Sequence, residues 1–236
     1  MKYSIIIPAY NEEARIAATV EDYAKYIQSS MDPQETELWI VVNGSSDRTG
    51  EIALGLERKY PFVHAWVTEQ RMGKGGAVMK GFELAQGEIL AFTDADNATI
   101  ASELRKLIIH TETRADAAIG SRWLPESRQD VRQPWTRQIA SRVFNLIVRA
   151  LFQFPYNDTQ CGAKAFRRSA IESIRDMVTA TGWAFDVDLI WNLRRQGYQV
   201  DEVPITWSDV SRSRVRMHRD APSMLVELVK IRFGRR

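Results

Sequence analysis

Short apolar runs alternate with longer amphipathic segments through the first half of the chain. Five runs rich in β-branched residues predict strands, at Ser4–Ile7, Leu38–Val42, Val63–Val67, Ile89–Phe92 and Ala117–Ile119. The segments between them carry apolar residues at helical spacing and predict helices at Glu12–Ser29, Asp47–Tyr60, Gly75–Ala85 and Ser102–Thr113. Each interval is long enough for a crossover between parallel strands, so the pattern predicts a doubly wound, mostly parallel α/β sheet.

The second half of the chain has a more helical pattern. Residues 133–154 predict one long amphipathic helix, and a polar loop follows at Pro155–Gly162. Beyond it we expect strands at Ala163–Phe166 and Gln199–Thr206, with helices at Ser169–Val178, Asp186–Gln196 and Ser223–Phe233. No internal repeat, low-complexity tract or clear linker interrupts the chain. The pattern therefore predicts one domain with a helical extension.

Composition and charge narrow the classes of protein. The 236 residues are 44% hydrophobic and 26% charged, as in a soluble globular protein, and the net charge of +2 excludes a general polyanion binder. Basic residues concentrate beyond Ser208, which favours contact with phosphate or an anionic membrane surface. Cys161 is the only cysteine, which excludes intramolecular disulfides and multi-cysteine zinc sites.

Neither a signal-peptide layout nor a run of the ~18–20 apolar residues that span a bilayer is present in the sequence. We therefore expect a cytoplasmic protein whose membrane contact is peripheral or made through a partner.

Polar segments follow four of the predicted strands, at Pro8–Glu12, Asn43–Asp47, Asp94–Asp96 and Gly120–Arg122. Ligands of such sheets bind beyond the carboxyl ends of the strands. The sequence therefore predicts that these segments line one site.

Asp94 and Asp96 stand two residues apart directly after an apolar strand. Two neighbouring carboxylates are unfavourable without a cation, and Mg²⁺ or Mn²⁺ takes carboxylate oxygens while leaving positions for phosphate. We therefore predict a metal site that neutralises a diphosphate leaving group. The alternative is an ordinary aspartate-rich turn or helix cap.

Two further turns are candidates for ligand binding. The glycine-rich turn around Lys74 could offer backbone N–H groups and an ammonium to phosphate, or could simply begin a helix. Asn43–Thr49 could hold a nucleobase and ribose, although Ser46 or Asp47 could instead cap the next helix. Tyr10 could stack on the same base or be a loop aromatic.

The order of these motifs resembles that of the family-2, A-fold glycosyltransferases. The residues concerned are Ile7–Glu13, Asn43–Thr49, Lys74–Val78 and Asp94–Asp96. Motifs of the second half resemble the branch of dolichyl-phosphate β-glucosyltransferases and polyprenyl-phosphate sugar synthases; they are Gly120–Arg122, Asp158–Lys164 and Trp183–Asp188. The resemblance covers nearly the whole chain, to about Trp207.

The resemblance implies inverting transfer of a hexose, glucose or mannose, from UDP-glucose or GDP-mannose to a polyprenyl phosphate with Mg²⁺ or Mn²⁺. It assigns donor binding to Pro8, Tyr10, Glu12, Asn43, Asp47, Lys74 and Asp94, and metal binding to Asp94 and Asp96. It assigns acceptor phosphate binding to Arg122, Arg137 and Ser141, and catalysis to Asp94, Asp96, Asp186 and Asp188. Arg212 and Arg214 belong to a basic loop that could fold over the donor diphosphate or the lipid phosphate, or could be a solvated loop.

On this interpretation the chain is one glycosyltransferase domain. Residues 1–122 form the nucleotide-sugar half, 123–207 the acceptor-side half, and 208–236 a basic loop with a C-terminal amphipathic helix. The expected partners are the nucleotide sugar, the lipid phosphate and a membrane surface or membrane protein at the cytoplasmic face, with no nucleic acid. The C-terminal helix could dock on lipid, pack on the core or form a dimer contact.

Departures from the family pattern leave the identity of the donor and the make-up of the metal shell open, and two alternatives to the expected reaction also remain. Val42 and Asn43 stand where relatives carry two aspartates, and Ala98 stands where some mannose synthases place a metal-binding glutamine. One alternative is a hydroxyl acceptor, for which Asp188 would be the base. The other is a non-catalytic nucleotide-sugar-binding protein, in which Asp186 and Asp188 would only complement a helix N-terminus.

Overall fold

The computed structural model describes residues 1–131, 135–210 and 217–234, and the side chains within these ranges other than those of residues 137 and 217–223. Seven strands form the central sheet in the order β3-β2-β1-β4-β7-β5-β8. They are β1 (Tyr3–Ala9), β2 (Thr36–Asn43), β3 (Val63–Thr68), β4 (Ile89–Phe92), β5 (Ala117–Ser121), β7 (Lys164–Arg167) and β8 (Val200–Pro204). All neighbours are parallel except β7, which runs antiparallel to β4 and β5. The predicted mostly parallel α/β sheet is confirmed.

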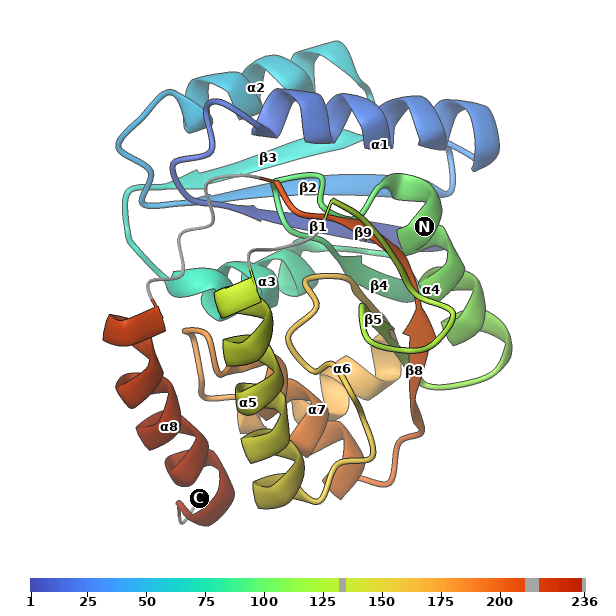
Figure 1. Cartoon of the computed structure of the whole chain (residues 1–236). Coiled ribbons are helices and arrows are strands. Elements are labelled where there is room, and N and C mark those ends of the chain that lie inside the picture. Colours follow the sequence, from blue (N-terminus) through green and yellow to red (C-terminus); the bar gives the residue numbers. More distant parts are fainter. Residues whose placement is uncertain (132–134, 211–216, 235–236) are drawn as a thin grey trace.

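Helices cover both faces of the sheet, because alternate strand residues point to opposite sides. On β1, Ile5 and Ile7 face one apolar core and Ile6 faces the other. The first core is closed by α1 (Ile16–Ser30), α2 (Thr49–Lys59) and α4 (Ala101–Thr113). The second is closed by α3 (Gly73–Leu84), α5 (Trp135–Phe152), α6 (Arg168–Ile174), α7 (Phe185–Arg195) and α8 (Met217–Phe233), which gives the three layers of Figure 1.

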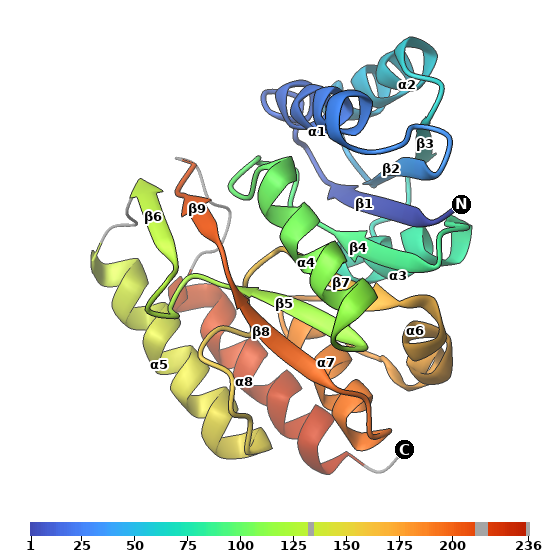
Figure 2. The same ribbon diagram turned by 90° about the vertical axis from the view of Figure 1, so that its right-hand side faces the viewer.

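Several element boundaries differ from the predictions. Strand β6 (Arg128–Val131), which pairs with β9 (Thr206–Ser208), was not expected because it is polar and mostly exposed. The predicted strand over 199–206 breaks at Ile205, where the N–H donates to Ser121 of β5 but the carbonyl accepts from Arg128 of the β6 side. The chain changes partners at that residue and continues into the outlying β6–β9 pair (Figure 2). The helix predicted over 169–178 ends as a 3₁₀ turn, η1 (Arg175–Met177).

The direction of β7 decides which residues reach the carboxyl edge of the sheet. β1, β2 and β4 are parallel, so their carboxyl ends lie at one edge. Because β7 is antiparallel, its first residue Lys164 pairs with Phe92, the last residue of β4. The start of β7 therefore lies beside the strand exit that carries Asp94.

Candidate active site

Asn43 connects the loops that follow β1 and β2 to the start of α3. Its side-chain nitrogen donates to the Ala9 carbonyl at 3.2 Å, and its side-chain oxygen accepts the Met72 N–H at 3.4 Å. Asn43 is buried, with 3% of its surface exposed. The neutral amide of Asn43 can both donate and accept. Asn43 therefore fixes the relative positions of three predicted donor-side segments.

The other predicted donor residues also lie in this loop cluster. Asp47 accepts hydrogen bonds from the Thr49 N–H at 3.0 Å and from the Glu13 N–H at 3.2 Å. These bonds support the capping alternative for Asp47 at the start of α2. The Arg71 guanidinium lies 4.6 Å from the centre of the Tyr10 ring. Pro8 is half-buried at the end of β1, and Glu12 accepts from Arg15 Nε at 2.7 Å.

Asp94, Lys74 and Asp186 meet at the exit of β4. Lys74 Nζ lies 3.0 Å from Asp94 Oδ1 and 3.6 Å from Asp186 Oδ2. Burial alone would raise the pKa of Asp94, but the ammonium of Lys74, with Lys164 and Arg122 farther away, holds that pKa below its ordinary value. Burial opposes the charge on Lys74, yet the two carboxylates raise its pKa. Asp94 and Lys74 therefore form an ion pair next to Asp186, and the three are residues predicted from the sequence.

Asp96 carries a negative charge that the described residues do not neutralise by an ion pair. Burial and then the neighbouring Asp94 raise the pKa of Asp96 to about 6. Its Oδ1 accepts the Ala98 N–H at 3.1 Å. The adjacent Asn97 has a left-handed backbone (φ 56°), and its buried side-chain oxygen has no hydrogen-bond partner. This end of the site is therefore electronegative and short of a cation.

The donor set fits a hard divalent ion that is completed by a ligand. Within the described ranges no three His, Cys, Asp or Glu side chains form a metal-binding group. Mg²⁺ typically binds through one or two carboxylates together with substrate phosphates and water. Asp94 and Asp96 supply two carboxylates, and the raised pKa of Asp96 is the effect expected of an anion without its counter-ion.

Affinity for Mn²⁺ in the presence of UDP-glucose is expected to weaken as the pH falls through about 6. The pKa of Asp96 is raised to about 6, so a proton competes with the ion below that pH. The loss should approach about tenfold per pH unit. UDP-glucose is a suitable ligand because its diphosphate lacks the monoester ionisation near pH 6. Electron paramagnetic resonance of free Mn²⁺ measures the affinity, and an unchanged value between pH 7 and 5 would contradict the assignment.

Asp188 lies one turn into α7 and is fully buried. Its Oδ2 accepts the Thr179 and Ala180 N–H groups at 2.7 and 2.9 Å, and its Oδ1 accepts Asn192 Nδ2 at 2.8 Å. Oδ2 thus holds the segment that precedes α7, and Oδ1 is bonded within α7 itself. These contacts give no support to the alternative in which Asp188 is a general base, and they agree with a helix-start role.

Gly73 and Gly75, in the first turn of α3, allow the segment that precedes α7 to approach this helix closely. Gly75 donates its N–H to the Thr181 carbonyl at 2.9 Å, and a Cβ at Gly75 would lie 2.6 Å from the Phe185 ring. Gly73 has φ 74°, and a Cβ there would overlap the Thr181 carbonyl. The sequence pattern that suggested a phosphate cradle is therefore explained in part by packing. Lys74 remains the phosphate-binding candidate of this turn.

Arg122 forms a buried ion pair with Asp158. Its Nε lies 2.7 Å from Asp158 Oδ2, and its second terminal nitrogen donates to Oδ1 at 3.0 Å. Burial opposes ionisation of Asp158, but Arg122 lowers its pKa. Trp207 lies against the guanidinium, with its ring centre 5.4 Å away. An acceptor phosphate at Arg122 would therefore share a guanidinium that already holds a carboxylate.

The remaining predicted phosphate-binding residues are less defined. Ser141 is half-buried on α5, where its carbonyl accepts from Asn145 at 3.1 Å. Arg212 and Arg214, and the side chain of Arg137, lie outside the described residues. Their roles stay predictions.

Replacing Arg122 by alanine is expected to destabilise the fold as well as any phosphate contact. The change leaves the fully buried Asp158 carboxylate without its partner. Removing one member of a buried pair typically costs about 3–5 kcal/mol in the free energy of unfolding. Urea unfolding measures the loss, and the Asp158→Asn variant should be similarly unstable. A fully stable Arg122→Ala protein would show that this pair contributes little.

Sequence reasoning did not identify Lys164, Asp158 or Gly162 as individual site residues, although all three belong to the motif Asp158–Lys164. The sequence predicts Lys164 only as a strand residue, whereas in the structure its ammonium is fully buried against Asp186. A Cβ at Gly162 would overlap the Asp94 carboxylate. Cys161 is buried, which raises its pKa to about 11, so it is a packing residue. A lysine within an apolar strand was the available signal.

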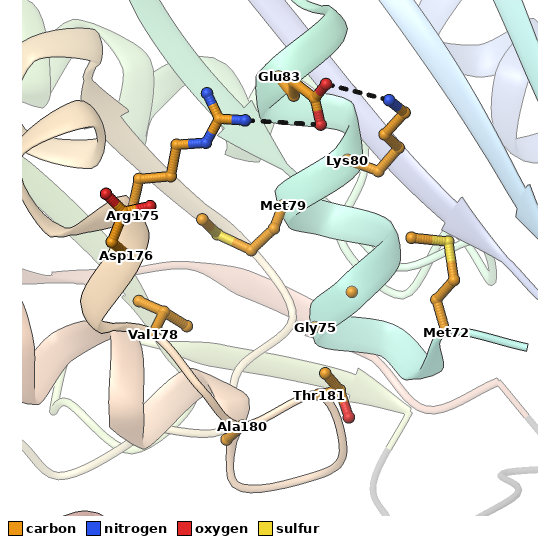
Figure 3. Close-up of a pocket in the computed structure, with 11 residues that line it drawn as sticks. Met72, Gly75, Met79, Lys80, Glu83, Arg175, Asp176, Val178, Ala180 and Thr181 are labelled. Atoms are coloured by element: carbon orange, nitrogen blue, oxygen red, sulfur yellow. Dashed lines mark hydrogen bonds and ion pairs between the residues drawn. The ribbon is translucent and has the colours of Figure 1, made fainter. Parts of the chain in front are cut away.

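A separate pocket of about 280 Å³ lies against the outer side of α3 (Figure 3). Glu83 on its rim pairs with Lys80 at 3.1 Å and with Arg175 at 3.7 Å. Met79 and Val178 line its apolar part. This pocket contains none of the predicted site residues, so we place the candidate active site at the charged carboxyl edge of the sheet instead.

Comparison with known proteins places this geometry in a family. Residues 4–175 match glycosyl transferase family 2. The chain is 32% identical to glycosyltransferase AglD of Haloferax volcanii, over 98% of this chain and 37% of that one. It is also 32% identical to the dolichyl-phosphate beta-glucosyltransferase of Saccharomyces cerevisiae, over 98% of this chain and 74% of the relative. The chain thus spans about a third of one relative and three quarters of the other.

Solved structures share the fold at lower identity. Glucosyl-3-phosphoglycerate synthase from Mycobacterium tuberculosis, in complex with Mn²⁺, UDP-glucose and phosphoglyceric acid, matches with a TM-score of 0.69 and 18% identity, over 96% of this chain and 79% of that one. TarS residues 1–349 from S. aureus match with a TM-score of 0.64 and 18% identity, over 98% of this chain and 64% of that one. The predicted A-type fold is confirmed.

Proposed function

The chain belongs to glycosyl transferase family 2, and from this premise we propose that it transfers a hexose from a nucleotide sugar to a polyprenyl phosphate of the dolichyl type. The observation that carries the proposal is the meeting of Asp94, Asp96 and Lys74 at the carboxyl edge of the sheet. Two carboxylates and a lysine there are the groups that a metal-bound diphosphate requires. Glucose is favoured as the sugar by the name of the yeast relative, and mannose is the alternative.

On the donor side, Asp94 and Asp96 would hold Mg²⁺ or Mn²⁺, which would offset the charge that develops on the departing diphosphate. Lys74 lies 3.0 Å from Asp94, where its ammonium can meet an anionic donor. The loops that Asn43 joins, with Pro8, Tyr10, Glu12 and Asp47, would bind the nucleoside. The transfer would invert the anomeric carbon: its bond to the diphosphate breaks and a bond to the acceptor oxygen forms on the opposite side.

On the acceptor side, a phosphate monoester needs no protein base. Its second pKa is about 6, so the attacking oxygen is largely ionised at neutral pH. The contacts of Asp188 agree with this, because both of its oxygens accept hydrogen bonds from the protein. Arg122 and Ser141, with Arg137, Arg212 and Arg214 beyond the described side chains, are the proposed phosphate-binding residues. No observation favours the hydroxyl-acceptor alternative.

An exposed apolar surface supports an acceptor that carries a lipid. Among the described side chains, eight of the fifteen large hydrophobic ones that are exposed belong to α5 and α8, which lie side by side (Figures 1 and 2). We call this set the α5–α8 face; it comprises Trp135, Ile139, Val143, Leu146, Leu225, Val226, Val229 and Phe233. Its two most exposed members are Trp135, at 72%, and Phe233, at 66%. Exposed apolar side chains in this number on two adjacent helices mark a contact with lipid or a partner.

The charges beside this face favour anionic lipid. Arg142 and Arg149 on α5, and Lys230 on α8, are exposed, while Glu227 is the acidic residue among the described side chains of the two helices. Basic residues along an amphipathic helix attract anionic headgroups. α8 also packs on the core through Leu228 and Ile231, so its two sides have different roles. No helix in the described ranges is both long enough and apolar enough to cross a bilayer. We propose peripheral contact at the cytoplasmic face.

The variant Ile139→Asp/Leu146→Asp is expected to lose binding to anionic vesicles. Both side chains are more than half exposed, at 54% and 65%, so the folded chain should tolerate the change. Burying one such side chain is worth about 1.5–3 kcal/mol, and the double variant should bind at least about 100-fold more weakly. Cosedimentation with phosphatidylglycerol vesicles measures it. Ile109→Asp on α4 is the matched control, and equal losses in both variants would contradict a specific face.

Product analysis tests the proposed reaction. The chain is incubated with Mn²⁺, UDP-glucose or GDP-mannose, and either a short polyprenyl phosphate or the corresponding polyprenol. Mass spectrometry of the extracted lipid should show one added hexose on the phosphate form only. A hexose on the polyprenol would establish a hydroxyl acceptor instead, and binding of a donor without any product would favour a non-catalytic protein.

A further inference from the structure

Lys164 is a fully buried lysine at the carboxyl edge of the sheet, with 0% of its surface exposed. Its ammonium donates to Asp186 Oδ1 at 2.6 Å and to the Cys161 carbonyl at 2.5 Å. Burying an ammonium is costly unless a carboxylate and further hydrogen bonds compensate it. A hydrophobic residue would serve packing alone at this point of β7. The charge on Lys164 therefore calls for an explanation beyond the stability of the core.

Lys164 begins a row of alternating charges that ends at the proposed donor site. Asp186 lies 2.6 Å from Lys164 and 3.6 Å from Lys74, and Lys74 lies 3.0 Å from Asp94. The side chains become steadily more exposed along the row, from 0% for Lys164 through 4% and 19% to 42% for Asp94. The row thus leads from the core to the open edge where a donor would bind.

Both ammonium groups lie near the Phe92 ring, at 5.4 Å from its centre for Lys164 and 5.5 Å for Lys74. Lys164 forms no ion pair with Asp94 among the described residues, and Asp186 links it to Lys74. One carboxylate oxygen of Asp186 faces each lysine. The orientation of Asp186 is therefore set from its buried side by Lys164.

Removing Lys164 would change the position of the Lys74 ammonium between its two carboxylate partners, Asp186 and Asp94. The contact of Lys74 with Asp186 is looser than its contact with Asp94, by the two distances of 3.6 and 3.0 Å. Without Lys164, Asp186 would keep a buried negative charge whose nearest described cation is Lys74. A strong attraction at low local dielectric would then draw the Lys74 ammonium inward, away from Asp94.

We propose that Lys164 is a positioning residue that acts through Asp186. It would hold Lys74 beside Asp94, where the Lys74 ammonium can contact the donor diphosphate. The inference rests on the proposed function of Lys74 and Asp94. β7 is hydrogen-bonded on both sides, to β4 and to β5, so Lys164 is anchored within the central sheet. Lys164 is fully buried, so the role proposed for it is one of positioning.

A double-mutant cycle tests this role. The variants are Lys164→Met, Asp186→Asn and the two combined, with kcat and the donor KM measured well below each melting temperature. We expect Lys164→Met to lower kcat/KM by about 10- to 100-fold, the range that a misplacement of about 1 Å produces. The combined variant should be no less active than Asp186→Asn alone, because on this proposal the effect of Lys164 on Lys74 passes through Asp186. Losses that multiply would overturn the proposal.

Two further arms keep the test decisive. If Lys164→Met does not fold, Lys164→Gln replaces it in the cycle, because its amide keeps N–H donors for Asp186 and the Cys161 carbonyl. Lys106→Met is the matched control, since Lys106 contacts the buried Glu103 at 2.7 Å away from the site and its loss should leave kcat/KM unchanged. A loss equal to that of Lys164→Met would indicate a general effect of removing a lysine.

The same cycle is also measured by calorimetry as affinity for Mn²⁺ with UDP or GDP, whichever the wild type binds. If the wild type turns over no lipid phosphate, the proposed function fails. The binding cycle still tests Lys164 in that case: non-additive losses support the positioning role, and additive losses overturn it.

Discussion

The Asp96→Ala variant is expected to lose at least about 10³-fold in turnover while its fold becomes no less stable. A bound metal supplies several kcal/mol of charge stabilisation to a departing diphosphate, and about 1.4 kcal/mol corresponds to tenfold in rate. The pKa of Asp96 is raised to about 6, above the ordinary carboxyl value, so its ionised form is disfavoured by folding at pH 7. Removing this charge therefore removes a repulsion with Asp94. Steady-state release of nucleoside diphosphate and thermal unfolding measure the two effects.

Two control variants distinguish the loss of the Asp96 charge from the loss of the turn that Asp96 stabilises through the Ala98 N–H. Asp96→Asn keeps an oxygen that can accept the Ala98 N–H, so it should match the alanine variant in activity and equal or exceed it in stability. Asp176→Ala, an exposed aspartate of η1, should leave turnover unchanged. An Asp96→Ala protein with near-normal turnover would show that the metal assignment is wrong. An inactive and unfolded one would show only that Asp96 supports the turn.

The Gly162→Ala variant is expected to lose about 100-fold or more in kcat/KM with little change in stability. A Cβ at this position would overlap the Asp94 carboxylate, which is the mobile end of a side chain that is 42% exposed. The carboxylate can rotate away into solvent, so the fold need not shift, but it would leave Lys74 and the proposed metal position. Displacements of about 1 Å in a reacting constellation cost up to about 10²-fold. Donor kinetics and urea unfolding measure both quantities.

Gly55→Ala is the matched control for this change. Gly55 lies within α2, and a Cβ there would meet nothing within 4 Å. Alanine in a helix interior is favoured over glycine by about 1 kcal/mol, so this variant should be somewhat more stable and fully active. A fully active Gly162→Ala protein would show that Asp94 does not need its present position. A large loss of stability would place the effect in the backbone rather than at Asp94.

Local sequence patterns predicted the elements of the first half because there the apolar period and the secondary structure coincide. Ile89–Phe92 is a strand with the predicted bounds, since four apolar residues are buried on both faces between two loops. The helix predicted from Glu12 begins at Ile16, because the Glu12 carbonyl closes a turn with the N–H groups of Arg15 and Ile16. β6 carries Arg128 and Asp130 on an exposed ribbon and has no apolar alternation to detect.

The candidate site depended on tertiary contacts that periodicity does not encode. The strand exits at Asn43 and Asp94 were predictable, since the carboxyl ends of parallel strands share an edge. The position of Lys164 was not, because it depends on β7 entering the sheet antiparallel between β4 and β5. Likewise, the sequence leaves Asp188 open as a general base for a hydroxyl acceptor or as a helix-start acid, and only the fold shows its two oxygens bonded to Thr179, Ala180 and Asn192.

The most direct test of the central claim is the rate of nucleoside diphosphate release from UDP-glucose and GDP-mannose, with and without a short polyprenyl phosphate and Mn²⁺. We predict release from one of the two donors that requires both the lipid phosphate and the metal, as expected if Asp94 and Asp96 hold the ion that offsets the leaving diphosphate. Release that proceeds equally without the lipid phosphate, or equally with the metal chelated, would contradict the claim.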